Sequence, residues 1–119
     1  MRDALWPVLV LALGFAARAG NAPKRSADLI ARGRAGYAIW CAVCHGERGA
    51  GDGVNAHTLD PRPRNFSSGK FKQGSRVNQI FDTLATGVPG SAMVAYKNLS
   101  EEERWALAWY VLELKAGRR

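Results

Sequence analysis

The chain has 119 residues and a formal net charge of +7, and 47% of its residues are hydrophobic. This length leaves room for one domain. Its only two cysteines, Cys41 and Cys44, could close only a very short disulfide loop, which would stabilise the fold little. No acid–base pair, nucleophile arrangement or phosphate-binding loop stands out, so the sequence does not indicate acid–base, nucleophilic or nucleotide chemistry.

The N-terminal segment has the three parts of a secretory signal. Residues 4–17 form an uncharged apolar run, with Arg2 before it and the sequence Ala17-Arg18-Ala19 after it. A helix over this run would reach only about 21 Å, which is short of the roughly 30 Å hydrocarbon core of a bilayer. We therefore predict a cleaved signal peptide over residues 1–19, a basic linker over residues 20–25 and a periplasmic protein. An uncleaved membrane tether is the alternative.

The first helix of the mature chain has a clear start. Ser26 is a candidate N-cap and Asp28 lies in the first turn, and the pattern predicts a helix to about Trp40. Gly33 and Gly36 lie inside this helix, where each costs about 1 kcal/mol in helix propensity. Interior glycines indicate that another backbone packs closely against this helix.

The two cysteines and a histidine form the pattern C-x-x-C-H, which is typical of covalent haem attachment. Cysteines at this spacing can each form a thioether bond to the porphyrin, and the histidine that follows can ligate the iron. A thioredoxin-type dithiol would need a βαβ setting, and a zinc site usually needs four ligands, for which the chain has two cysteines, His45 and His57. We predict one haem c, bound through Cys41 and Cys44, with His45 as an iron ligand.

The middle of the chain is predicted to be mostly loop. Residues 46–74 are rich in Gly, Pro, Asn and Ser and show no periodicity. Such a long loop is unusual in a compact domain unless it wraps around a large ligand. A short helix follows over residues 76–86, with Gly87 at its C′ position, and residues 87–93 are again predicted to be loop.

The C-terminal helix is the clearest in the chain. Ser100 and Glu103 form a capping box, and the apolar pattern predicts a helix to about Leu114. No strand pattern stands out, so the folded domain, which we place at residues 26–116, is expected to be all-α. Residues 117–119 are predicted to be a basic tail.

The second iron ligand is a choice between two residues. Met93 is the only methionine left once the signal is removed, and it lies in a Gly/Pro loop that can aim its side chain at a ligand. A thioether suits haem iron, although most methionines only fill gaps in a core. His57 lies twelve residues after His45, in a loop tied closely to the same side of the ring. We predict Met93 as the ligand and keep His57 as the alternative.

These runs of sequence resemble small class I monohaem cytochromes c over nearly all of the mature domain. The resemblance is carried by Gly33-x-x-x-Tyr37-x-x-x-Cys41-x-x-Cys44-His45-Gly46, Gly51-Asp52-Gly53, Leu59-x-Pro61-x-Pro63-Arg64-Asn65-Phe66, Gly87-Val88-Pro89-Gly90-Ser91-Ala92-Met93 and Leu99-Ser100-x-Glu102-Glu103 leading into Trp109-Tyr110-Val111. It implies His45 and Met93 as axial ligands. It leaves open which group accepts the proton of the His45 Nδ1 atom.

The resemblance also implies an all-α cytochrome c fold, with three to four helices around one covalent haem. In this fold the N- and C-terminal helices cross, and Gly33 and Tyr37 would meet Leu107 and Tyr110. Arg64 resembles a residue that pairs with a haem propionate, and a solvated arginine is the alternative.

An iron with both axial positions filled has no place for a substrate, so we expect an electron carrier rather than an enzyme. The expected function is one-electron transfer in the periplasm by a monomer. The alternatives are a haem c subunit of a larger membrane or dehydrogenase complex, and a haem sensor or enzyme with a labile sixth ligand.

The basic residues in the middle of the chain suggest how partners are recognised. We expect several of them to surround the haem edge and to steer the protein towards acidic docking surfaces on redox proteins, with plain solvated charges as the alternative. These residues are Arg48, Arg62, Arg64, Lys70, Lys72, Arg76 and Lys97. Nucleic acid is not an expected partner of an exported protein, and membrane contact is expected only if the N-terminal segment is uncleaved.

Overall fold

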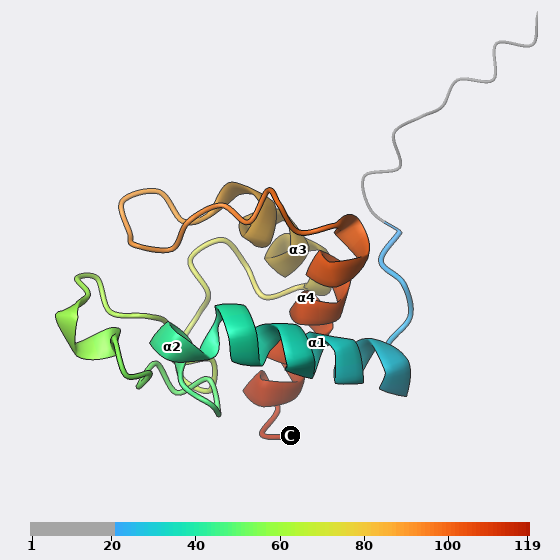
Figure 1. The fold of residues 1–119 in the computed structure, drawn as a ribbon, viewed down its shortest axis with the longest axis horizontal. Coiled ribbons are helices and arrows are strands. Elements are labelled where there is room, and N and C mark those ends of the chain that lie inside the picture. The colour runs from blue at the N-terminus through green and yellow to red at the C-terminus, as the bar shows by residue number, and fades with distance from the viewer. Residues whose placement is uncertain (1–20) are drawn as a thin grey trace, which may run out of the picture.

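The structure is a computed structural model that describes residues 21–119, and the predicted signal peptide lies outside them. Within these residues the chain forms four α-helices and one 3₁₀ turn and no strand, which confirms the all-α prediction (Figure 1). The elements in chain order are α1 (Ala27–Trp40), α2 (Ala42–His45), η1 (Ala56–Thr58), α3 (Val77–Thr86) and α4 (Glu101–Lys115). The three long helices begin and end within one residue of the predicted limits. None of the described helices is long and apolar enough to cross a bilayer.

The predicted caps start the first and last helices. The Ser26 hydroxyl accepts a hydrogen bond from the Leu29 amide at 3.2 Å, at the start of α1. At the start of α4, the Glu103 amide donates to the Ser100 hydroxyl at 3.1 Å, and the Ser100 amide donates to the Glu103 carboxylate at 2.8 Å. Each cap satisfies helix amides that have no partner within the helix, which typically stabilises a helix by about 1 kcal/mol.

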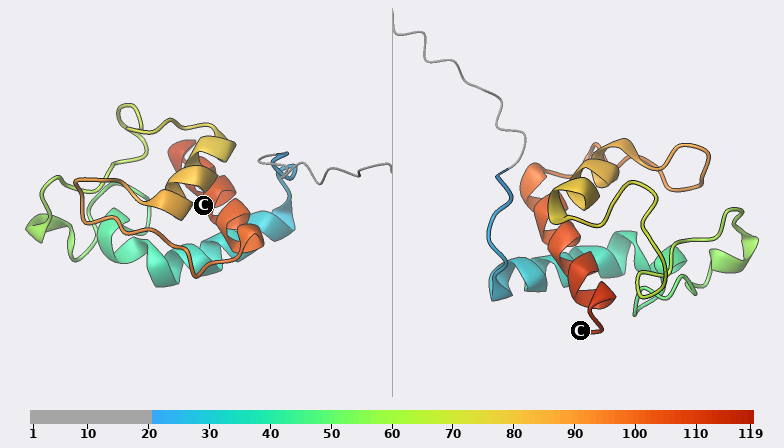
Figure 2. Two further views of the ribbon diagram at one scale, coloured as in Figure 1. Left: turned by 90° about the horizontal axis from the view of Figure 1, so that it is seen from above. Right: turned by 180° about the vertical axis from the view of Figure 1, so that it is seen from behind.

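Helices α1 and α4 cross and pack closely, as Figures 1 and 2 show. A Cβ atom added to Gly33 would lie 2.7 Å from the Cβ of Tyr110 and closer still to the carbonyl oxygen of Ala106. Gly36 lies against the side chain of Leu107. The crossing is therefore confirmed, and it explains why α1 tolerates two glycines: Gly33 meets Tyr110 and Ala106, while Leu107 packs against Gly36.

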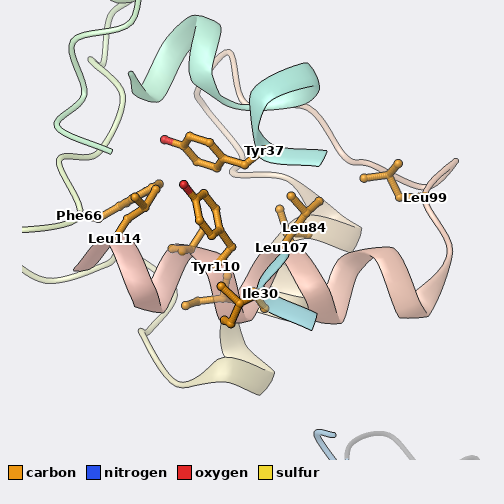
Figure 3. Packing of buried hydrophobic residues seen from close by; sticks show 11 residues of the cluster. Ile30, Tyr37, Phe66, Leu84, Leu99, Leu107, Tyr110 and Leu114 are labelled. Atoms are coloured by element: carbon orange, nitrogen blue, oxygen red, sulfur yellow. The ribbon is translucent and has the colours of Figure 1, made fainter. Parts of the chain in front are cut away.

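The hydrophobic core lies between α1, α3 and α4 and includes one residue from the long loop (Figure 3). The rings of Tyr37 and Tyr110 meet edge to face with their centroids 5.2 Å apart. Phe66, which is only 6% exposed, comes from the loop and joins this aromatic group. The loop that follows η1 is thus anchored in the core rather than lying free on the surface.

Both ends of the described chain are attached to α4. The Trp109 indole donates to the Pro23 carbonyl at 2.9 Å. The Glu113 side chain is only 6% exposed, and it pairs with Arg25 at 2.5 Å and with Arg118 at 3.0 Å. Hydrogen bonds from Arg25 and then Arg118 lower the pKa of Glu113 to about 2. This buried carboxylate therefore links the segment before α1 to the residues after α4.

Candidate cofactor site

A cavity of about 350 Å³ lies beside the core and collects the residues that the sequence singled out. Cys41, Cys44, His45 and Met93 all line it, although Met93 lies far from the other three in the sequence. His57 does not line it, and its side chain is exposed on η1.

Most of the cavity wall is apolar or aromatic. Six of its large side chains come from two helices and two loops: Tyr37, Trp40, Phe66, Phe71, Leu84 and Tyr96. A wall of this kind suits a large, mostly apolar ligand that is oriented by a few polar groups. The aromatic residues Phe71 and Tyr96 were not predicted as site residues. Phe71 lies within the predicted loop of residues 46–74, and Tyr96 lies between the predicted loop of residues 87–93 and the C-terminal helix.

The backbone turn at the end of α1 presents three of the predicted residues together. The Cys41 amide donates to the Tyr37 carbonyl at 2.9 Å, which ends α1, and the Cys41 carbonyl then accepts from the His45 amide at 2.9 Å. Residues at positions i, i+3 and i+4 of a helical turn lie on one face. Cys41, Cys44 and His45 have this spacing, so the short helix α2 directs them to one side.

The His45 imidazole is oriented by a backbone carbonyl. Its Nδ1 atom lies 3.1 Å from the carbonyl oxygen of Arg64, and its ring stacks on Phe66 with the centroids 4.7 Å apart. Burial lowers the pKa of His45, and the hydrogen bond to Arg64 partly offsets this effect. A neutral imidazole that donates from Nδ1 keeps the Nε2 lone pair free for a metal. The Arg64 carbonyl is the acceptor that the sequence left open.

The two cysteines are unbridged and lie partly buried in the cavity wall. Burial, with a contribution from Cys44, raises the pKa of Cys41 to about 12. Burial therefore disfavours a Cys41 thiolate, unlike the activated thiolate of a thiol enzyme or thioredoxin-type pair. Among residues 21–119, no three His, Cys, Asp or Glu side chains come together as they would in a zinc site.

The loop that carries Met93 leaves α3 and returns to it. The Gly87 amide donates to the Thr83 carbonyl at 2.7 Å, and the Tyr96 amide donates to the Leu84 carbonyl at 2.8 Å. Gly87 has a φ of +72°, and a Cβ atom there would lie 2.8 Å from the Met93 carbonyl oxygen. A glycine is thus required where the start of this loop approaches the backbone of Met93, whose side chain is partly buried.

Three basic residues of the predicted set lie at the cavity. Arg62, Arg64 and Lys72 line it and are exposed to solvent. The other four basic residues of the predicted set do not line it. Three cations at the cavity can pair with carboxylate groups on a ligand that is otherwise apolar.

Comparison with known proteins identifies the family. Residues 30–115 match the family model described as cytochrome c, and the chain belongs to this family. The chain is also similar to one chain of the reducing HAO-like protein complex of Kuenenia stuttgartiensis, with 33% sequence identity and a TM-score of 0.74. That match covers 81% of this chain and 48% of the other, so this chain spans about half the length of that relative. No curated protein sequence matches the chain.

Membership of this family assigns the cofactor and the general function. The cofactor is haem c, and the function of the family is haem-based electron transfer. Cytochrome c domains are usually extracytoplasmic. The residues present fit this group: neighbouring thiols at Cys41 and Cys44, an oriented imidazole, a thioether, an apolar wall and cations for the propionates.

Proposed function

We propose that this chain is an exported carrier of single electrons. Its haem is attached through Cys41 and Cys44, and its iron takes His45 and Met93 as axial ligands. The observation that supports this proposal is that all four residues line the same cavity, whereas His57, the alternative ligand, lies exposed outside its wall.

The bound haem supplies an iron that alternates between Fe(II) and Fe(III). The protein controls this change through its own residues. The Arg64 carbonyl orients the His45 imidazole through the 3.1 Å contact with Nδ1, and burial favours its neutral form. The Met93 thioether favours the ferrous state and raises the reduction potential relative to ligation by two histidines. The apolar wall excludes water, which also disfavours the state of higher charge.

The two filled axial positions distinguish a carrier from a haem enzyme or gas sensor. We expect the reduced parent protein to bind carbon monoxide slowly, because Met93 must first leave the iron. Met93→Ala should bind it rapidly. His57→Ala is the matched control, and it should behave like the parent. Rapid binding by the parent, or slow binding by Met93→Ala, would show that the sixth site is not occupied by Met93.

Attachment of the cofactor has its own test. The mass of the denatured parent protein should exceed that of the polypeptide by one haem. Variants with a single cysteine, Cys41→Ser or Cys44→Ser, should keep one thioether bond, and the double variant should release the haem on denaturation. Haem retained by the denatured double variant would contradict the assignment.

A second candidate function is a haem c subunit of a larger complex. It is favoured by the similarity to one chain of the Kuenenia stuttgartiensis complex, of which the match covers 48%. Purification of the native protein at low and at moderate salt separates the two proposals. A monomer of its own mass in both conditions supports the diffusing carrier, whereas a stoichiometric partner that survives moderate salt supports the subunit.

A further inference from the structure

The loop from Val88 to Met93 is closed by two backbone hydrogen bonds. Its first half is a turn in which the Ser91 amide donates to the Val88 carbonyl at 3.2 Å. Pro89 and Gly90, whose φ is +78°, occupy the two central positions, which is the residue pattern of a type II turn. The second bond runs from the Val88 amide to the Met93 carbonyl, also at 3.2 Å.

The Ser91 hydroxyl adds two further hydrogen bonds within the same loop. It donates to the Val88 carbonyl at 2.6 Å and accepts from the Met93 amide at 3.2 Å. The donor and an acceptor site of one hydroxyl are therefore both used. Through this hydroxyl and the Val88 amide, the backbone of Met93 is bound on both its N–H and its C=O side.

The base of the loop is held separately. The Gly87 carbonyl accepts from the Gln73 side-chain amide at 3.2 Å and from the Thr86 hydroxyl at 3.1 Å. These contacts fix where the loop leaves α3, but they do not touch Met93 itself. Among residues 21–119, only the Ser91 hydroxyl and the Val88 amide bind the backbone groups of Met93 directly.

Orientation of a methionine depends strongly on its backbone. The side chain has three rotatable bonds and a soft, adaptable thioether, so it does not choose one direction by itself. Ser91 lines the same cavity as Met93 and is partly buried there. A hydroxyl that fixes the Met93 amide therefore restricts where the sulfur can lie in the cavity.

We propose that Ser91 is the positioning residue for the Met93 thioether. Its hydroxyl holds the loop in the conformation in which Met93 enters the cavity, and it thereby sets how easily another ligand displaces Met93 from the iron. This inference rests on the proposed ligation by Met93. An added iron ligand binds only to the fraction of molecules in which Met93 has dissociated from the iron. Its apparent affinity therefore measures how firmly the loop keeps Met93 on the iron.

The test is a titration of the oxidised holoprotein with imidazole, followed by the loss of the sulfur-to-iron charge-transfer band. Ser91→Ala and Ser91→Val should bind imidazole about tenfold more tightly than the parent. Ser91→Thr has nearly the same shape as Ser91→Val but keeps the hydroxyl, so it should bind like the parent. Ser68→Ala, an exposed loop serine, controls for the loss of a hydroxyl elsewhere.

The outcomes separate the two proposals. A parent protein without the charge-transfer band would overturn ligation by Met93, and the role of Ser91 with it. A parent with the band, whose imidazole affinity is unchanged in Ser91→Ala and Ser91→Val, would overturn only the role of Ser91. A lower melting temperature with unchanged imidazole affinity would do the same, because it would show a purely structural contact. If Ser91→Ala does not fold, the pair Ser91→Val and Ser91→Thr decides the question.

Discussion

Replacing Gly33 by alanine should destabilise the protein strongly, because the substitution inserts a methyl group into the crossing of α1 and α4. The new Cβ would lie 2.7 Å from the Cβ of Tyr110 and would overlap the Ala106 carbonyl oxygen. Alanine gains about 1 kcal/mol over glycine in helix propensity. Overpacking costs typically 1–3 kcal/mol, and the upper value of about 3 applies here because the obstacle is backbone. The net loss is about 2 kcal/mol, or roughly 10 °C in melting temperature for a domain of this size.

Gly36→Ala is the matched control, since it makes the same change three residues further along the same helix. Its Cβ would lie 3.3 Å from Cδ2 of Leu107, a flexible side chain that can move by a few tenths of an ångström. Gly36→Ala should therefore be neutral or stabilising by up to about 1 kcal/mol. Guanidinium chloride unfolding of the oxidised holoproteins, followed by far-ultraviolet circular dichroism, measures both. Equal midpoints, or a greater loss in Gly36→Ala, would refute the steric argument.

Two further predictions concern charge. The pKa of Glu113 is depressed from an ordinary value of 4.5 to about 2, so its pairing with Arg25 and Arg118 should stabilise the protein above pH 4.5 and should be lost as the pH falls towards 2. Glu113→Gln should lower the free energy of unfolding at pH 7 by about 1–3 kcal/mol, and it should remove the pH dependence of stability that Glu113 causes between pH 4.5 and 2. A variant that keeps the same pH dependence would contradict the assignment. Oxidation of the reduced protein by ferricyanide should slow as salt rises from 0.01 M to about 0.15 M, because the cations at the cavity are then screened. Lys72→Gln should lower the oxidation rate at low salt about twofold. Lys97 lies outside the cavity wall, so Lys97→Gln should lower this rate less. Equal effects of the two substitutions would show that the attraction of ferricyanide comes from charges elsewhere.

The helices could be predicted from the sequence because their caps use side chains of recognisable chemistry. Ser26, and the pair Ser100 and Glu103, start their helices where the sequence indicated. Gly33, a glycine inside a helix, similarly indicated a close contact with another backbone, although the sequence pattern alone did not identify that neighbour. These features depend on residues that are close in sequence or on a single residue type, so a linear pattern contains them.

The members of the site could be predicted because their residue types are rare in this chain. Residues 21–119 contain two cysteines, two histidines and one methionine, which leaves few combinations. The cavity gathers Cys41, Cys44, His45 and Met93 and leaves out His57. Their roles as thioethers and iron ligands remain predictions.

The Arg64 carbonyl could not have been predicted as the partner of His45, because every residue has a carbonyl and only the folded loop selects one. The role of Glu113 was also missed. Its signal was a lone acidic residue within the apolar run of α4, but its partners Arg25 and Arg118 lie on either side of the domain in sequence. Contacts of this kind depend on how distant segments fold together.

The central claim is that Met93 completes the iron coordination, and the optical spectrum of the oxidised protein tests it most directly. Thioether ligation should give a far-red sulfur-to-iron charge-transfer band in the parent protein. We expect this band to disappear in Met93→Ala and to persist in His57→Ala. Absence of the band from the parent, or its persistence in Met93→Ala, would contradict the account.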